Sequence, residues 1–410
     1  MKNLLILGAG TSGTMMANHL RSKLKKDQWN ISIVDQYKTH YYQPGFLFLP
    51  FDIYTEDQVK KVGKKFIPNG VNYIQKKIEQ IFPDENKVKL EDETINYDLL
   101  IIATGCKIAP QETEGMKGKN WHKNVFDFYT YEGSLALRNK LREFKGGKMI
   151  VHFTEMPIKC PVAPLEFVFL ADDYFTKKGI RDKVDLTYVT PLGGAFTKPK
   201  ATAALGHLLS EKNISVVTDF AIEKVDNETN QIVDYGGKVV DFDLLVTVPT
   251  NMGDDLINRS GMGDDLNFVP TDHNTLQSIG HKNVFVIGDA TNVPASKAGS
   301  VAHFASETLT DNILLYLDGK PLKKEFDGHA NCFIETGKNK ALLIDFNYTQ
   351  EPVEGTFPIP GIGPLKLLRE SIFNHWGKLA FRWIYWNMLL KGIPIPLVSR
   401  NMSKKGKKIE

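Results

Sequence analysis

The chain has 410 residues, of which 42% are hydrophobic and 24% are charged, and its formal net charge is +3. This length predicts two or three domains, and the composition is typical of a globular protein and excludes a disordered chain. The three widely spaced cysteines exclude a disulfide-stapled secreted scaffold, and their spacing offers no metal site. The short apolar run at the start predicts a strand rather than a signal peptide, and no segment approaches the ~20 apolar residues of a membrane span.

The first predicted elements form a nucleotide-binding unit. In "LLILGAGTSGTMMANHL" a buried strand is followed by Gly8, Gly10 and Gly13 and then by a helical pattern. This G-x-G-x-x-G spacing allows a tight turn and lets a pyrophosphate approach the N-terminus of the helix. The next strand, "NISIVDQ", leads to Asp35, which is placed to bind a ribose hydroxyl.

Two later segments favour FAD over NAD in this unit. The strand in "YDLLIIATGCKI" leads to Ala103, Thr104 and Gly105, and the strand in "KNVFVIGDATNVPAS" leads to Gly288 and Asp289. These resemble the ATG and GD signatures of two-dinucleotide-domain flavoproteins. The helical pattern after the second signature is expected to direct its positive N-terminus at the flavin. The sequence therefore predicts FAD as the cofactor.

The segment between these signatures has strand patterns of its own and predicts a second nucleotide-type domain. Its opening turn, "TEMPIKCPVAP", contains three prolines and no glycine. Proline removes backbone donors and stiffens the chain, so a pyrophosphate cannot approach closely. We therefore expect that this second domain does not bind NAD(P)H.

The same turn carries Cys160, and Cys332 follows the second FAD signature. A thiol pair beside a flavin can pass two electrons to it, provided that nearby cations lower a thiol pKa, and Lys159 and Lys297 are candidates for this. Cys106, directly after ATG, is interpreted as a small residue at the end of a strand.

Other titratable residues lie near these segments. Glu155 and Glu166 flank the Cys160 turn and are candidates for proton transfer. His152, His303 and His329 are interpreted as structural histidines.

Three stretches, "MPIKCPVAPLEFVFLADDYF", "FVIGDATNVPASKAGSVAHFAS" and "NCFIETGKNKALLIDFNYTQEPVEGTFP", resemble the mitochondrial-type sulfide:quinone oxidoreductases, and the resemblance extends over nearly the whole chain. It implies that Cys160 and Cys332 form a disulfide or sulfur-bridged pair beside FAD. Hydrosulfide attacks this pair, Cys332 becomes a persulfide, and Cys160 passes electrons to the flavin. Sulfide, glutathione or sulfite then accepts the sulfur, and a quinone accepts the electrons. Asp35 departs from the family, in which Glu is usual.

The resemblance also implies an α/β fold with two Rossmann-like domains and a C-terminal amphipathic helical region. The predicted FAD domain comprises residues 1–107 and 276–320. The second domain, residues 108–275, is inserted between its two parts. Residues 321–410 form the C-terminal region, with the redox cysteine, the quinone site and membrane-associating helices.

The C-terminal region contains a helical pattern and a basic tail. Residues 361–410 hold ten Lys or Arg and two Glu. Apolar residues recur at helical spacing at Leu365, Leu368, Ile372, Trp376, Leu379, Trp383, Trp386 and Leu390, and Lys366, Arg369, Lys378 and Arg382 lie off this stripe. A basic amphipathic helix with tryptophan can lie in a membrane interface. We therefore expect a peripheral, monotopic membrane protein on the cytoplasmic side, with Phe333 and Phe357 lining the quinone site.

Several alternatives stay open at this point. An NADH:quinone oxidoreductase or a persulfide or sulfur reductase could have the same fold. A non-catalytic FAD-binding protein could use the basic tail to recruit a partner. No nucleic acid is expected as a partner, and a homo-oligomer is compatible with the sequence.

Overall fold

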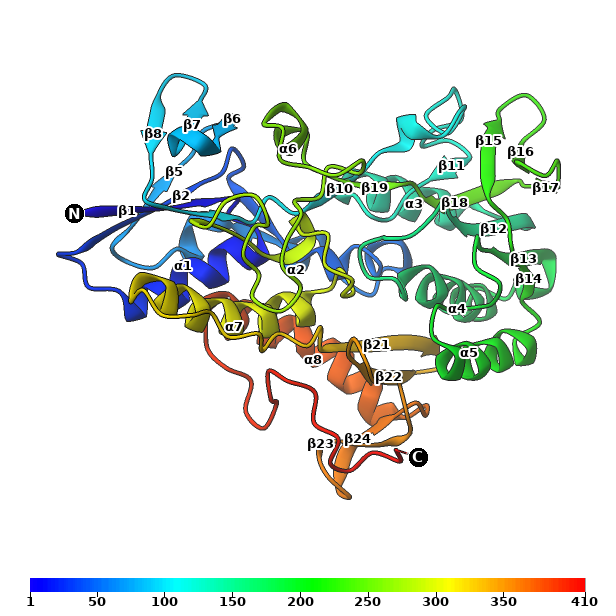
Figure 1. The fold of residues 1–410 in the computed structure, drawn as a ribbon. Helices are drawn as coiled ribbons and strands as arrows, with labels where there is room; N and C mark the ends of the chain where they lie inside the picture. The colour runs from blue at the N-terminus through cyan, green and yellow to red at the C-terminus, as the bar shows by residue number, and fades with distance from the viewer. Residues whose placement is uncertain (410) are drawn as a thin grey trace.

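A computed structural model describes residues 1–409, so Glu410, the last residue of the predicted C-terminal region, lies outside the described residues. Figure 1 shows two parallel sheets side by side, with the C-terminal elements beneath and between them. This arrangement confirms the predicted fold with two Rossmann-like units. The domain limits at residues 107, 275 and 320 stay predictions.

The first sheet has the strand order β20-β9-β1-β2-β5, and its pairings are parallel. The β20 strand comes from a part of the chain far from the other four, so the second unit is inserted between them. Hydrophobic side chains fill β9, β20 and most of β1 and β2, so both faces of these strands are buried, whereas the edge strand β5 has no buried residue. The strands are β1 (Lys2–Leu7), β2 (Trp29–Val34), β5 (Val71–Ile74), β9 (Leu99–Ile102) and β20 (Val284–Val286).

The second sheet has the order β11-β18-β12-β13-β14 and is also parallel. Helix α4 (Ala163–Lys177) follows β12 after the proline-containing turn. The strands are β11 (Val125–Phe126), β12 (Gly147–Phe153), β13 (Val184–Val189), β14 (Ser215–Val217) and β18 (Leu244–Val248).

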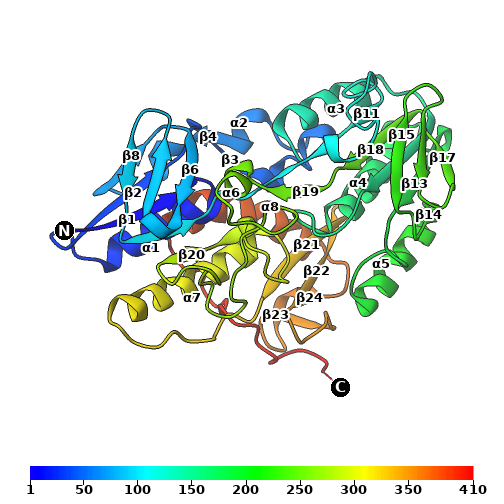
Figure 2. The ribbon, with the colours of Figure 1, turned by 45° about the horizontal axis from the view of Figure 1, so that its top comes forward.

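The C-terminal region contains a four-stranded sheet that the sequence patterns did not predict. Its order is β21-β22-β24-β23, and β21 lies against α4. Helix α8 (Ile372–Asn387) lies centrally between the two parallel sheets (Figure 2). The strands are β21 (Ala330–Gly337), β22 (Lys340–Phe346), β23 (Gly355–Ile359) and β24 (Gly363–Leu367).

Further elements complete the described chain. The helices are α1 (Thr11–Lys23), α2 (Glu56–Val59), α3 (Tyr131–Glu143), α5 (Pro199–Glu211), α6 (Asp255–Arg259) and α7 (Gly299–Leu317). Short strands form small sheets: β3 (Thr39–Tyr41), β4 (Lys60–Val62), β6 (Ile78–Phe82), β7 (Lys87–Leu90), β8 (Thr94–Asn96), β10 (Cys106–Ile108), β15 (Ile222–Asp226), β16 (Gln231–Asp234), β17 (Val239–Asp241) and β19 (Asn251–Gly253).

The predicted helical stripe is wrong in its first part. Leu365 belongs to β24, and Leu368 has a positive φ of 54°. The helix begins only at Ile372, because the Ser371 side chain accepts a hydrogen bond from the backbone N–H of Asn374 and caps the helix. The stripe also does not form one continuous face, since Trp376 is exposed and Trp386 is buried.

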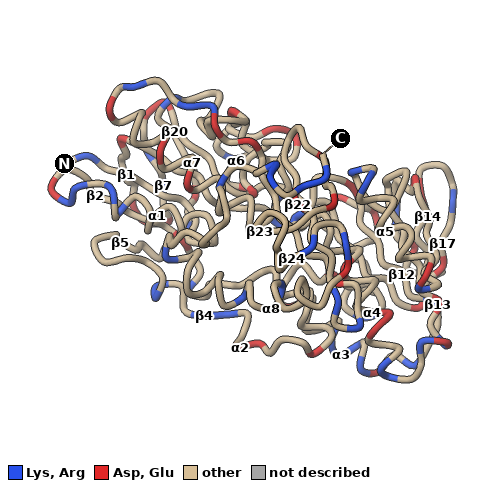
Figure 3. Tube along the Cα trace, turned by 90° about the horizontal axis from the view of Figure 1, so that it is seen from below, with Lys and Arg blue, Asp and Glu red and all other residues tan. Residues whose placement is uncertain are grey.

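The basic tail is held against the body of the chain. Arg400 forms ion pairs with Asp311 and Glu325, Lys407 pairs with the buried Asp345, and Lys408 pairs with Glu354. Figure 3 shows this basic stretch beside the C-terminus. The positive charge of the tail is therefore partly neutralised within the chain.

Candidate active site

A cavity of about 810 Å³ opens where the carboxyl ends of β1 and β9 meet. In open parallel sheets, ligands bind at such a point, where the connections leave the sheet in opposite directions. The cavity is lined by residues from both FAD signatures and from the Cys160 turn, among them Gly8, Gly10, Asp35, Ala103, Thr104, Gly105, Asp289, Lys297, Cys106, Lys159 and Cys160. The fold thus collects most of the predicted site residues around one space.

The glycine loop is compact for steric reasons. Gly8 has a φ of +96°, and a Cβ there would meet the carbonyl oxygen of Ala103 at 2.5 Å. A Cβ on Gly13 would collide with the carbonyl oxygen of Gly8, so Gly13 brings α1 against the loop without lining the cavity. Gly288 also lies behind the cavity, against Ser12. These glycines let the two signatures approach each other closely.

Asp35 lies at the end of β2 and helps to shape the loop. Its Oδ2 accepts the backbone N–H of Ala9 at 2.7 Å, and its Oδ1 accepts that of Tyr37 at 2.9 Å. Burial raises the pKa of this carboxyl group, and the two backbone N–H donors oppose the rise. A carboxylate has further acceptor capacity, so Asp35 can still bind a ribose hydroxyl.

Three features of the cavity fit FAD. Within residues 1–409, the Thr104 hydroxyl is buried without a hydrogen-bond partner, and it lines the cavity. Gly10 and Ala298 precede α1 and α7 and have no side chain that could cap them, so the first N–H groups of both helices are available to a ligand. Two helix N-termini favour the pyrophosphate and a reduced, anionic flavin.

Lys297 does not act as a free cation beside the Cys160 thiol. Its Nζ donates to the carbonyl oxygens of Asp289 and Thr291 at 2.9 and 2.7 Å, and it lies 3.7 Å from the centre of the Phe268 ring. Its own carbonyl oxygen accepts the backbone N–H of Cys160 at 2.7 Å. Lys297 therefore joins the second FAD signature to the Cys160 turn.

Cys160 adopts a left-handed conformation, with a φ of 45°, just before α4. The Tyr129 hydroxyl donates to the carbonyl oxygens of Lys159 and Cys160, and the N–H of Lys159 donates to Asn251 Oδ1. These bonds from neighbouring elements hold the turn in place. Cys160 consequently faces the cavity from a rigid position.

Cys332 lies on β21, the strand that contacts α4. Burial raises the pKa of the Cys332 thiol, and negative charge on Cys160 adds to this rise. Cys332 belongs to a hydrophobic core, and the partly buried Cys160 packs against the same core. Cys106, Cys160 and Cys332 are free thiols in the described chain, so the bridged form stays a prediction.

The expectation of a lowered thiol pKa is wrong for this state of the protein. Burial raises the pKa of Cys160 to about 12, and the cation that opposes it most is Lys378 rather than Lys159 or Lys297. Lys159 instead donates to Gln43 Oε1. Cys106 lies 3.9 Å from Asp289 Oδ2, and burial raises its pKa to about 12 as well.

Sequence reasoning missed the role of Lys378, which it placed among the cations off the apolar stripe. Its Nζ lies 2.8 Å from Glu166 Oε1 and 3.0 Å from the carbonyl oxygen of Phe333. Burial opposes the charge of Lys378, but Glu166 and Cys160 raise its pKa above the ordinary value. Burial likewise raises the pKa of Glu166 against the effect of Lys378. Both side chains line the cavity, so a buried ion pair lies beside the cysteines.

A second residue of α8 also reaches the cofactor side of the cavity. The Tyr385 hydroxyl lies 2.7 Å from Thr11 Oγ1 and 2.6 Å from His40 Nε2, and it lines the cavity. Burial lowers the pKa of His40 to about 4, so this histidine is neutral at physiological pH. The glycine loop is thus fixed to the C-terminal helix.

Other predicted residues lie outside the cavity. Phe357 pairs with Leu365 across β23 and β24, and a Cβ on Gly377 would meet both Leu365 and the Phe333 ring. The two phenylalanines therefore gather near α8, around Leu365. Glu155 accepts a hydrogen bond from Thr250 Oγ1 at 2.6 Å.

The predicted structural histidines are buried. His152 bonds to Thr247 Oγ1 at 2.9 Å, and His329 bonds to Asp345 at 2.8 Å and stacks on Phe304. His303 lies 3.6 Å from Glu307.

Comparison with known proteins agrees with this geometry. Residues 2–151 match the family model of the pyridine nucleotide-disulphide oxidoreductases. The chain is 29% identical to the mitochondrial sulfide:quinone oxidoreductase of Mus musculus over 397 residues, covering 95% of this chain and 86% of the relative. Identity to the Dictyostelium discoideum enzyme of the same name is 28% over 396 residues, with the same coverage.

Among solved structures, the sulfide:quinone oxidoreductase of Aquifex aeolicus matches with a TM-score of 0.79 at 20% identity, covering 96% of this chain and 92% of that one. This likeness supports the fold, and the curated relatives support the cofactor and the reaction class. The chain is an FAD-dependent oxidoreductase of the two-dinucleotide-domain fold, and it resembles the sulfide:quinone oxidoreductases along nearly its whole length.

Proposed function

We propose that this protein oxidises sulfide to sulfane sulfur and passes the electrons through FAD to a quinone. The observation that carries the proposal is that Cys160 lines the FAD cavity from the turn just before α4, and that Cys332 lies on β21, the strand that contacts α4. The proline-containing turn that holds Cys160 replaces the glycine loop that a nicotinamide cofactor would need.

In the proposed reaction, hydrosulfide attacks a disulfide between the two cysteines. The sulfur–sulfur bond breaks, Cys332 becomes a persulfide, and Cys160 leaves as a thiolate. A nucleophile such as sulfide, glutathione or sulfite then takes the outer sulfur, and Cys332 is left as a thiolate. Loss of two electrons restores the disulfide, so the net result is the two-electron oxidation of sulfide.

FAD bound in the cavity would accept this electron pair from the cysteines and deliver it to the quinone. The chain's own contribution is electrostatic. Lys378 stabilises negative charge on Cys160. The ammonium group of Lys378 acts to lower the pKa of the Cys160 thiol, and the Cys160 thiolate acts to raise the pKa of Lys378. Glu166, paired with Lys378, is positioned to exchange protons in the same cavity.

We further propose that the C-terminal region associates with the cytoplasmic surface of a membrane. The quinone is dissolved in this membrane. None of the helices within residues 1–409 is long and apolar enough to cross a membrane. Several large apolar side chains of this region are exposed, and so are the cations Lys366, Arg369 and Lys391. This combination is typical of an interfacial surface. The exposed apolar residues of this region are Ile362, Ile372, Phe373, Trp376, Trp383, Ile393, Leu397 and Ile409.

The triple variant Phe373→Ser, Trp376→Ser, Trp383→Ser is expected to bind vesicles containing anionic lipid roughly 100-fold more weakly, since each aromatic side chain contributes about 1 kcal/mol or more when buried in the interface. Vesicle co-sedimentation measures this. Tyr235→Ser, at an exposed tyrosine of the second unit, is the matched control. Equal binding by wild type and triple variant would contradict the membrane assignment.

The function itself is tested by steady-state assay of the FAD-loaded protein with a soluble quinone. We expect quinone reduction that depends on sulfide, with sulfane sulfur formed in equal amount, and no reduction with NADH. Quinone reduction by NADH without any response to sulfide would instead identify an NADH:quinone oxidoreductase.

A further inference from the structure

The proposed reaction requires a proton from solvent, and the following inference rests on that proposed function. Oxidation of two hydrosulfide ions to a disulfanide ion releases one proton and two electrons. Reduction of a quinone to a quinol takes up two protons and two electrons. One proton per turnover must therefore reach the buried site from water.

A chain of titratable groups runs from the cavity toward the surface. Glu166 lines the cavity, and its Oε1 accepts the backbone N–H of Glu335 at 2.9 Å. The Glu335 side chain is only 2% exposed, and both of its oxygens lie within 3.0 Å of His375 Nδ1. His375 is 16% exposed through its side chain, so it is the member of this chain that reaches water.

Two unpartnered polar atoms lie next to these residues. Within residues 1–409, the hydroxyl of Tyr54 and Nη1 of Arg382 are buried without a hydrogen-bond partner. The Arg382 guanidinium lies 4.4 Å from the centre of the Tyr54 ring, and Glu335, Glu166 and Lys378 all influence the pKa of Tyr54. Buried polar groups of this kind are normally satisfied by ordered water. Tyr54 and Arg382 therefore have unused hydrogen-bonding capacity beside Glu335 and the ion pair.

We propose that His375 and Glu335 form a proton-uptake route that supplies the Glu166–Lys378 pair during quinone reduction. Glu335, protonated at neutral pH, passes its proton to the polar cluster around Tyr54, Glu166 and Lys378. The carboxylate that remains takes a proton from His375 through their hydrogen bond, and His375 takes a new proton from water. The two residues are positioning and relay residues, since they lie outside the cavity itself.

The charged surroundings make proton exchange possible near neutral pH. Burial raises the pKa of Glu335 to about 8, and Glu166 and Asp173 add to this rise while Lys378 opposes it. Burial lowers the pKa of His375; Lys177 adds to this effect and Asp173 opposes it. Glu335 thus holds a proton below about pH 8 and releases it above, whereas a glutamate with an ordinary pKa would be ionised throughout this range.

The test separates the two half-reactions of the FAD-loaded protein by stopped flow. For Glu335→Gln we expect flavin reduction by sulfide within about threefold of wild type, and flavin reoxidation by a soluble quinone slowed roughly 10-fold or more. The pH dependence of reoxidation near pH 8 is expected to disappear in this variant. His375→Ala is expected to slow reoxidation similarly, with partial rescue by added imidazole.

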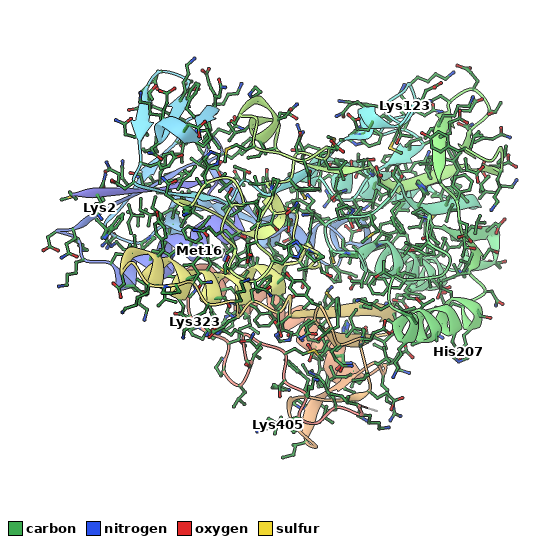
Figure 4. All side chains as sticks on the ribbon, viewed as in Figure 1. Lys2, Met16, Lys123, His207, Lys323 and Lys405 are labelled. Atoms are coloured by element: carbon green, nitrogen blue, oxygen red, sulfur yellow. The ribbon has the colours of Figure 1, made fainter. Side chains whose placement is uncertain are left out.

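His207→Asn is the matched control, because His207 is 72% exposed on α5, at the edge of the molecule (Figure 4), and it pairs with Glu211 of the same helix. It is expected to behave as wild type. Normal reoxidation and a normal pH profile in Glu335→Gln, with an active wild type, would overturn the route. Equal slowing of flavin reduction and flavin reoxidation in Glu335→Gln would also overturn the route, since this result would indicate that Glu335 has a structural role. If sulfide does not reduce the flavin of the wild-type protein, the proposed function itself is wrong, and the route that rests on it is wrong as well.

Discussion

Replacing either Cys160 or Cys332 by serine is expected to reduce the rate of sulfide-dependent flavin reduction by roughly 10³-fold or more. Losses of this size are typical when the nucleophile is removed from a set of catalytic residues that act together. Serine is close in size to cysteine but cannot form a disulfide or a persulfide. Because both cysteines belong to one electron path, the double variant should be no slower than either single variant. Rapid mixing with sulfide under anaerobic conditions measures these rates.

The controls for this prediction concern the cofactor. Both variants should retain FAD at wild-type occupancy, because Cys332 lies outside the cavity and the turn of Cys160 is held by backbone hydrogen bonds. Dithionite should reduce the flavin in all variants. Full-rate reduction by sulfide in either serine variant would contradict the assigned path of electrons.

Breaking the Glu166–Lys378 ion pair is expected to have the largest effect on stability. Glu166 is fully buried and the Lys378 side chain is 10% exposed, so Glu166→Gln or Lys378→Met leaves an uncompensated charge in the core. Loss of one partner of such a pair costs about 3–5 kcal/mol of unfolding free energy. Urea denaturation of the FAD-loaded protein measures this quantity.

The double variant Glu166→Gln, Lys378→Met distinguishes stability from function. Removing both charges should restore much of the lost stability, since no unpaired charge remains. Turnover with sulfide and quinone should stay low, because the cation beside Cys160 is absent. Additive destabilisation in the double variant would contradict a direct interaction between the two side chains.

The sequence allowed the cofactor half of the site to be predicted, because that half depends on local patterns. The glycines at positions 8, 10 and 13 occur within one strand–turn–helix segment, and Asp289 follows directly from a buried strand. Each signature constrains its own backbone, so short-range patterns are sufficient. The parallel sheets follow from the alternation of buried strands and helices.

The buried charged cluster beside the cysteines depends on contacts between distant segments. Glu166 lies on α4, Glu335 on β21 and Lys378 on α8, and only tertiary packing brings them together. One signal was available: His375, Lys378 and Arg382 recur at intervals of three and four along a largely apolar helix. Such spacing places polar residues on one face, which here is directed at the buried cluster.

The start of α8 and the tail show a different limit. Leu365 and Leu368 continue the helical spacing of apolar residues, yet pairing between β23 and β24 and the Ser371 cap decide the local structure. The periodicity of apolar residues in a short stretch of sequence does not reveal a strand that is stabilised by pairing with a partner strand outside that stretch. Likewise, the net charge of the tail does not reveal that Lys407 pairs with a buried aspartate.

The most direct test of the central claim is an anaerobic titration of the FAD-loaded protein, following the absorbance of oxidised flavin. We predict that sulfide bleaches this absorbance, that a soluble quinone then restores it, and that NADH has no effect. Bleaching by NADH but not by sulfide would contradict the account, because electrons would then reach the flavin without the Cys160 and Cys332 pair.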